Sequence, residues 1–175
     1  MAQREKWFDR VFELGTPVSL MPNIVERLRG TPTRIEERVP GIPPELRLSG
    51  ADGGWSIQEQ VGHLLDLEPL WAGRLDDLLS GAEELRPADL TNAKTHGAGH
   101  NKVGLADLLA RFRELRTDFV SRLEALSDDQ LHLAAMHPRL KQPMRAVDLA
   151  FFVAEHDDHH LATISQAIRE AGTSS

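Results

Sequence analysis

The stretch Glu155-His156-Asp157-Asp158-His159-His160 holds three of the eight histidines of this 175-residue chain. It lies within residues 144–171, whose apolar residues recur at helical spacing and predict the last helix of the fold. At about 100° per residue, His156 and His160 both fall within about 60° of Val153 on the helical wheel, on the apolar side of this segment. His159 falls on the flank. The two histidines are therefore expected to face the core.

His156 and His160 are four residues apart, so their imidazoles project from one helical face about 6 Å from each other. That spacing allows two imidazoles to hold one divalent metal ion. A solvated histidine-rich surface is the alternative interpretation. The inward direction favours a metal, because each ring nitrogen of a buried imidazole needs a partner and two packed side by side would be costly to satisfy without an ion.

Outside this segment the chain is helical almost throughout. Further long helices are expected at residues 19–39, 56–80 and 105–126, after a short opening segment at residues 7–14. Ser56-Ile57-Gln58-Glu59 fits a capping box, which marks the start of the second long helix. Gly30-Thr31-Pro32 is expected to interrupt and kink the first, with Thr31 capping the restart.

These patterns, with no strand pattern of any length, predict an all-α four-helix bundle with a short extra N-terminal helix and long inter-helix loops. The whole chain, residues 1–175, has the size of a single domain. The longest connection covers residues 86–102. Its His96 and His100 are four residues apart, but the glycines between them argue against a helix, and flexible loop residues are expected there.

The composition excludes several classes of protein. With 41% hydrophobic and 27% charged residues the chain is typical of a globular protein, and its net charge of −7 argues against nucleic acid as a partner, which needs a basic face. The absence of cysteine excludes disulfides, thiolate metal sites and a nucleophilic cysteine. No segment approaches the roughly 18 apolar residues of a membrane span. The N-terminus is too charged for a secretory signal, so we expect a cytoplasmic protein without a membrane partner.

A catalytic metal site usually takes three protein ligands and leaves one position for water or substrate. The best candidate for the third ligand is His63 on the second long helix, which is flanked by Val61, Leu64 and Leu65 and lies on or beside the buried stripe. Taken alone, His63 is better explained as a core histidine with satisfied hydrogen bonds. Beside an inward-facing histidine pair it becomes the favoured ligand, because facing helices are how bundles build metal sites.

Two segments resemble the DinB/YfiT-like family of metalloenzymes. Gly54-Trp55-Ser56-Ile57-Gln58-Glu59-Gln60-Val61-Gly62-His63-Leu64 is similar to the family's Trp-Ser start followed by a histidine two turns later. Glu155-His156-Asp157-Asp158-His159-His160-Leu161 is similar to its terminal His-x-x-x-His helix. The middle, from Asp89 to Arg116, is similar less specifically, so the resemblance covers about residues 19–169.

The resemblance implies a four-helix bundle that holds one divalent transition metal ion with three histidines, here His63, His156 and His160, and a water that completes the coordination sphere. It also implies a small-molecule substrate and a homodimer, because members of the family are often dimers. Some members are S-transferases or isomerases that use a low-molecular-weight thiol. Three neutral nitrogen ligands suit zinc, nickel, copper or ferrous iron, and Zn²⁺ or Ni²⁺ is expected.

Such an ion would lower the pKa of a bound water or thiol toward neutrality, which suits a hydrolase or a thiol S-transferase. Since the chain has no cysteine, the thiol would come from outside. Candidate catalytic groups are Asp66 as a base or fourth ligand, Glu59 as a partner of a ligating imidazole, and His159 as a general base at the pocket mouth. The alternative for each of the three is a solvent-exposed position on a helix surface with no catalytic role. The competing function is a non-catalytic bundle that binds a metal or a ligand, for example in a stress response.

Two further pairs of charged residues are assigned roles by their positions. Glu155 and Asp157 stand beside the histidine pair and are candidates to orient it, although solvated charges are the simpler interpretation. Arg113 and Arg116 are expected to pair with acids across the bundle rather than to bind an anionic substrate.

Overall fold

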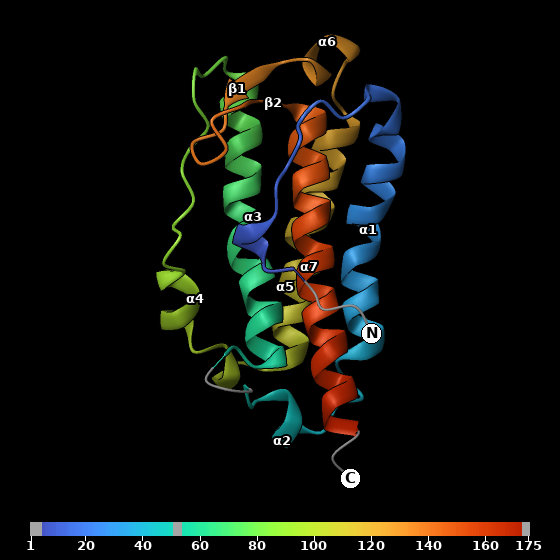
Figure 1. Cartoon of the computed structure of the whole chain (residues 1–175). Coiled ribbons are helices and arrows are strands. Elements are labelled where there is room, and N and C mark those ends of the chain that lie inside the picture. Colours follow the sequence, from blue (N-terminus) through green and yellow to red (C-terminus); the bar gives the residue numbers. More distant parts are fainter. Residues whose placement is uncertain (1–4, 51–53, 173–175) are drawn as a thin grey trace.

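Four long helices make up the body of the computed structural model, which describes residues 5–50 and 54–172 (Figure 1). They are α1 (Met21–Arg38), α3 (Ile57–Leu79), α5 (Leu105–Glu124) and α7 (Ala146–Gly172). The shorter helical elements are η1 (Trp7–Asp9), η2 (Val18–Leu20), α2 (Pro44–Arg47), α4 (Ala93–Ala98), η4 (His100–Lys102) and α6 (Asp128–Leu131). The predicted four-helix bundle is confirmed, and the short N-terminal helix is a three-residue 3₁₀ turn.

The long helices pack in a ring in which α1 contacts α5 and α7, and α3 contacts the same two helices. The first and second long helices, α1 and α3, therefore lie across the diagonal of the bundle, and so do the third and fourth, α5 and α7 (Figure 1). This order makes α3 and α7 neighbours. Histidines on α7 that point inward thus meet the face of α3 on which His63 lies.

The start of α3 forms as its sequence predicts. The Ser56 hydroxyl accepts a hydrogen bond from the backbone N–H of Glu59, and the Glu59 carboxylate accepts one from the backbone N–H of Ser56 at 2.8 Å. This capping box satisfies two N–H groups that the helix itself leaves without partners.

The predicted interruption of α1 is wrong, because the helix runs unbroken through Pro32. Proline has no N–H to donate to the carbonyl of Leu28 one turn earlier. The guanidinium of Arg116 on α5 donates to that carbonyl instead, at 3.5 Å. Thr31 does not cap a new helix: its hydroxyl contacts the Arg27 carbonyl at 3.2 Å and the Asp157 carboxylate at 2.8 Å.

A two-stranded antiparallel sheet corrects the expectation that no strand is present. β1 (Ala134–Met136) pairs with β2 (Pro143–Arg145), with Ala135 opposite Met144. Strands of three residues are too short for a recognisable alternation of apolar and polar residues. The loop between them, residues 137–142, places His137 beside the C-terminal half of α3.

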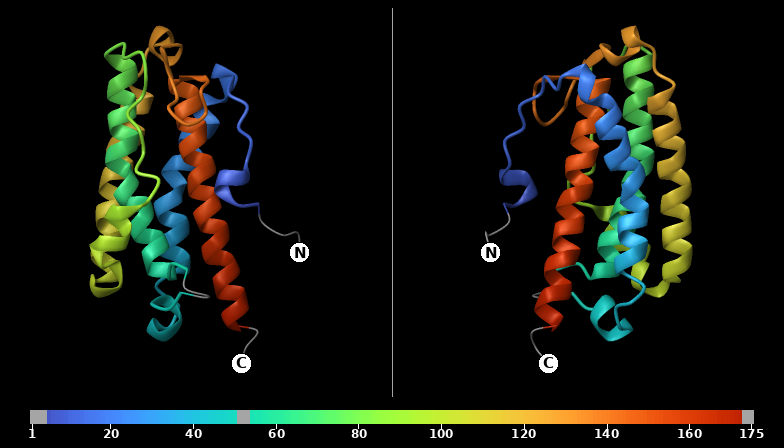
Figure 2. Two further views of the ribbon diagram at one scale, coloured as in Figure 1. Left: turned by 60° about the vertical axis from the view of Figure 1, so that its left-hand side comes forward. Right: turned by 90° about the vertical axis from the view of Figure 1, so that its right-hand side faces the viewer.

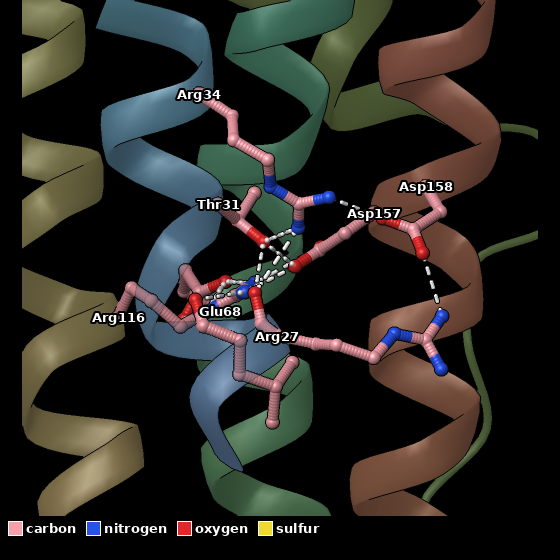
Figure 3. Close-up of polar contacts among 8 residues, drawn as sticks. Arg27, Thr31, Arg34, Glu68, Arg116, Asp157 and Asp158 are labelled. Carbon is pink, nitrogen blue, oxygen red and sulfur yellow. Dashed lines mark hydrogen bonds and ion pairs between the residues drawn. The ribbon is translucent and has the colours of Figure 1, made fainter. Parts of the chain in front are cut away.

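A buried ionic cluster joins all four long helices (Figure 3). Arg116 on α5 pairs with Glu68 on α3, with 2.5 Å between Nη2 and Oε1, and with Asp157 on α7. Thr31 on α1 completes the cluster through its hydrogen bond to Asp157. The expectation that Arg116 pairs with acids is confirmed, and burial raises the pKa of Glu68. The cluster fixes how α7 is rotated, and with it the direction of His156.

The N-terminal segment lies along the outside of α7, and the connection between α3 and α5 runs beside α3 (Figures 1 and 2). Trp7 of η1 contacts α7 through Phe152, with 5.1 Å between ring centroids. In the part of the chain that the structure describes, no helix is both long and apolar enough to cross a membrane.

Candidate metal centre

Three buried histidines meet between α3 and α7. His63, His156 and His160 are 4%, 5% and 7% exposed, and one potential ligand atom from each lies within 4.8 Å of the others. The Nε2 atoms of His156 and His160 are 3.1 Å apart. Nitrogen ligands at 2.0–2.1 Å from a tetrahedral zinc ion lie about 3.3 Å from each other, so this pair has a spacing that fits an ion.

The tautomer of His63 follows from its neighbours. The Thr95 hydroxyl donates its single proton to the Asp66 carboxylate at 2.9 Å. His63 Nδ1 lies 3.1 Å from the same hydroxyl oxygen, which is then free only to accept. Nδ1 of His63 therefore carries the proton, and Nε2 keeps a lone pair for an ion.

His160 is oriented in the same way. Its Nδ1 lies 2.6 Å from Oε1 of Gln60 and donates to it, which leaves the lone pair on Nε2. The Nε2 atoms of His63 and His160 both carry lone pairs. A neutral His156 can donate at most one hydrogen bond to them, through its own Nε2–H. A cation between the three rings would be bound by these lone pairs. The donor set therefore fits a metal ion.

Burial keeps two of these imidazoles neutral. Desolvation lowers the pKa of His63 to about 4, with smaller contributions from His100 and His96 in the same direction and from Asp66 in the opposite one. Desolvation also lowers the pKa of His156 far below its ordinary value. A metal binds the neutral form of imidazole, so both residues are held in the state that a ligand needs.

The stability of the metal-free chain is expected to fall as the pH is lowered from about 6.5 to 4. In this window His63 binds a proton in the unfolded chain, where its pKa is about 6.5, but not in the folded one. Stability therefore rises with pH, and this residue contributes about 3 kcal/mol that is present above pH 6.5 and lost near pH 4. Urea unfolding of the chelator-treated protein at several pH values measures the slope. It should be shallower in His63→Gln by up to about 1.4 kcal/mol per pH unit, and equal slopes would contradict the assignment.

Thr95→Val is expected to weaken metal binding roughly 10–100-fold, because the hydroxyl that orients His63 is lost while the side chain keeps its size. A competition titration against a chromogenic chelator measures the dissociation constant. Thr117→Val, on the exposed side of α5, is the matched control and should leave the constant unchanged. An unchanged constant in Thr95→Val would mean that this hydroxyl does not orient a ligand.

The three histidines open onto a cavity of about 730 Å³ between α3 and α7. Its volume lies in the range of small-molecule pockets. All three tryptophans of the chain line it, and Trp55 packs on His63 with 4.5 Å between ring centroids. Further apolar lining comes from Phe8, Leu67, Leu70, Leu90 and Phe152.

Asp66 and His100 form a pair behind His63. His100 Nε2 lies 2.8 Å from the Asp66 carboxylate, and both side chains are buried. The expectation of a flexible loop at His100 is wrong, as is the argument against a helix at His96, which lies within α4. The glycines permit this packing: Gly99 ends α4 with a φ of +63°, and the ring of His100 occupies the space that a Cβ on Gly62 would need.

The other candidate residues are placed as follows. Asp66 reaches His63 only through Thr95 and is outside the group of mutually close ligand atoms, so its role as a base or ligand stays a prediction. The Glu59 carboxylate is engaged in the capping box, and its predicted role stays untested. His159 lines the cavity beside Trp7, at 5.6 Å between ring centroids. Glu155 pairs with Arg10 and Arg27 rather than with an imidazole.

The structure adds three residues that the sequence did not single out. Gln60 and Thr95 are the hydrogen-bond partners of His160 and His63, and Trp55 covers the cluster. Gln60 lies three residues before His63 and therefore on the same face of α3, which is a signal the sequence contained. Thr95 carried no such signal, because its contact depends on how the connection after α3 folds back.

A four-helix bundle with three convergent buried histidines at the base of a cavity defines the class to which this protein belongs. Residues 27–164 match the model of the DinB superfamily, and the chain belongs to that family. It is 26% identical over 160 residues to the protein named "Putative metal-dependent hydrolase YfiT" of Bacillus subtilis (strain 168), covering 86% of this chain and 85% of that one.

Two solved structures share the fold. YfiT from Bacillus subtilis, described with "an unusual four-helix bundle topology", superposes with a TM-score of 0.81 at 22% identity, over 93% of this chain and 94% of its own. The colibactin self-resistance protein ClbS, solved in complex with a double-stranded DNA, superposes with a TM-score of 0.60 at 16% identity, over 85% and 95%. At these identities the superpositions establish the fold alone.

Proposed function

We propose that this chain is a metal-dependent hydrolase or thiol S-transferase that holds one divalent transition metal ion, Zn²⁺ or Ni²⁺, with His63, His156 and His160. The observation that carries the proposal is the convergence of these three buried imidazoles at a cavity of small-molecule size. The similarity to YfiT supports the hydrolytic form of the activity. A closed structural site would be coordinated by protein on all sides, whereas this one adjoins the cavity.

When bound, the ion would supply a Lewis acid that makes a water or an external thiol nucleophilic near neutral pH. The protein contributes the rest. Thr95 and Gln60 hold the rings of His63 and His160 by accepting from their Nδ1–H groups. Trp55 packs on His63 and Trp7 packs on His156, and we propose that both keep bulk water from the cluster. We further propose that His159, which lines the cavity, accepts a proton from the substrate.

The proposed substrate is a small molecule rather than a nucleic acid, because the net charge of −7 opposes phosphate-rich partners. The proposed setting is the cytoplasm, and the proposed assembly is a homodimer, as in many members of the family. A non-catalytic protein that binds a metal or a ligand in a stress response is the competing function.

The experiment compares the full chain loaded with Zn²⁺ or Ni²⁺ and the same chain after chelation. Both are assayed on activated esters and amides, and on electrophiles with a low-molecular-weight thiol present. Turnover that appears with the metal and disappears on chelation supports the proposal, and the substrate panel separates hydrolysis from thiol transfer. A chain that takes up neither metal would overturn it. Metal uptake without turnover on either panel would favour the competing function.

A further inference from the structure

A second cluster of nitrogen donors lies in the same cavity, toward the opposite end from the three histidines. Arg74 comes from the C-terminal half of α3, and His137 and Arg139 come from the loop between β1 and β2; all three line the cavity. Arg74 and His137 are each 2% exposed. Arg74 lies eleven residues after His63 on the same helix, which corresponds to about 16 Å along the helix axis.

The donors of this cluster outnumber its acceptors. His137 Nδ1 accepts from the backbone N–H groups of Arg139 and Leu140, at 3.2 and 3.1 Å, so a neutral His137 carries its proton on Nε2. That Nε2 lies 3.1 Å from Nη1 of Arg74, which can only donate. Two N–H groups thus face each other without an acceptor between them.

Two more donors nearby lack acceptors. Nη2 of Arg139 and Nε1 of Trp71 are buried without a hydrogen-bond partner among the described residues. Trp71 also lines the cavity and lies against both clusters, with 5.7 Å between its ring and that of His156 and 5.6 Å between its ring and Cζ of Arg74. Native proteins rarely leave several buried donors of one site unpaired, so a bound ligand, ion or water is expected to supply the acceptors.

The cluster has no ion-pair partner in the described part of the chain; the Asp77 carboxylate acts on Arg74 from beyond ion-pair distance and raises its pKa. Arg74 donates to the carbonyl of Arg86, and Arg139 lies over the ring of Phe8; neither forms an ion pair with a carboxylate in the described part of the chain. Burial lowers the pKa of Arg74 to about 10, although the charged form still predominates at neutral pH. The one carboxylate among the described lining residues, Asp89, is held by Thr91 and Ala93.

We propose that Arg74, His137 and Arg139 bind an anionic oxygen group, a carboxylate or a phosphate, at one end of the substrate. A planar guanidinium pairs well with either group, and an oxyanion would accept from the N–H groups that face each other here. The apolar walls between the two clusters then favour a substrate with an apolar middle, whose reactive group lies at the three histidines. That the anion is part of a substrate rests on the proposed function. Binding of an anion at this subsite does not require a metal.

The test is isothermal titration calorimetry of the full chain with 4-phenylbutyrate and with its neutral counterpart 4-phenylbutan-1-ol. Both probes have the same apolar body, so their difference reports the anionic group. Each titration is run on metal-loaded and on chelator-treated protein. Arg139→Gln is the test variant, because Arg139 is only partly buried and its loss should not prevent folding. Arg111→Gln, an exposed residue of α5 outside the cavity, is the control with the same change in charge.

The acid should bind at least tenfold more tightly than the alcohol, with or without metal. Arg139→Gln should remove that preference, whereas Arg111→Gln should keep it. Displacement of the acid by inorganic phosphate would assign the subsite to phosphate, and failure to displace it would assign the subsite to carboxylates. Equal binding of acid and alcohol, no binding of either anion, or a preference that Arg139→Gln retains would overturn the proposal. If the preference for the acid over the alcohol vanished on chelation, the anion would be bound by the metal and the proposal would be overturned. If the chain took up no metal but still preferred the acid, the anion subsite would be supported and only the proposed function would be overturned.

Discussion

Replacing His156 with alanine is expected to remove the metal ion and the metal-dependent activity together, while the bundle stays folded. The His156 and His160 Nε2 atoms are 3.1 Å apart, and with His156 absent only two ligands remain. The affinity should fall by more than the roughly 10–100-fold that loss of an outer hydrogen-bond partner costs. The fold should survive, because among the described residues the side chain of His156 forms no hydrogen bond to a group outside the three histidines.

Three measurements on the same samples check this result: elemental analysis after dialysis against Zn²⁺, the initial rate, and the far-ultraviolet circular dichroism. His132→Ala is the control, since that histidine is exposed on α6's C-terminal side and lies outside the cavity. Full metal content in His156→Ala would contradict the assignment of this ligand. His160→Ala serves as a second variant: loss of the fold in both, with metal-dependent refolding of the parent, would make the site structural rather than catalytic.

Replacing Arg116 with leucine is expected to lower the free energy of unfolding by about 3–5 kcal/mol. The guanidinium is 1% exposed and lies between the carboxylates of Glu68 and Asp157, which are 2% and 0% exposed. Without it, two acids share a site that water does not reach, and the carbonyl of Leu28 beside Pro32 loses its donor. Because small proteins are stable by only about 5–15 kcal/mol, a loss of this size is a large share of the total.

Urea unfolding at neutral pH measures the effect, and Arg113→Leu is the matched control on the same helix. Arg113 pairs with Glu36 at the surface, so its loss should cost less than about 1 kcal/mol. The triple variant Arg116→Leu, Glu68→Leu and Asp157→Leu should recover most of the stability, because the buried charges then disappear together. A change below about 1 kcal/mol in Arg116→Leu alone would show that this ionic cluster does not stabilise the bundle.

Local sequence patterns correctly predicted the features that depend on interactions between residues close together in the sequence. The capping box at Ser56 needs only Glu59, three residues on, and the inward direction of His156 and His160 needs only the spacing of apolar residues on one helix. His63 was predicted as a buried partner from the stripe on which it lies, and it is 4% exposed. Interactions within one or two helical turns are contained in the sequence window that a pattern covers.

Two of the predictions that failed concern contacts between distant segments. α1 was expected to break at Pro32, but the carbonyl that this proline leaves free is satisfied by Arg116, which lies far along the chain on α5. His100 was expected in a flexible loop, but Gly62 on α3 leaves room for its ring and Asp66 binds it. Neither partner is visible from the neighbouring residues, since propensity is overridden wherever tertiary packing supplies a better partner.

The sequence by itself therefore determined the helices, their buried faces and the residue types at the candidate metal centre, because these depend on periodicity and side-chain chemistry. The tertiary structure decided that α3 and α7 are neighbours, that Thr95 and Gln60 orient two of the three imidazoles, and that Arg74 meets His137 across the same cavity. Residues 63 and 95, or 74 and 137, come together only when the connections fold back along α3. The free energy of such contacts comes from burial and hydrogen bonding between surfaces that a linear pattern does not pair.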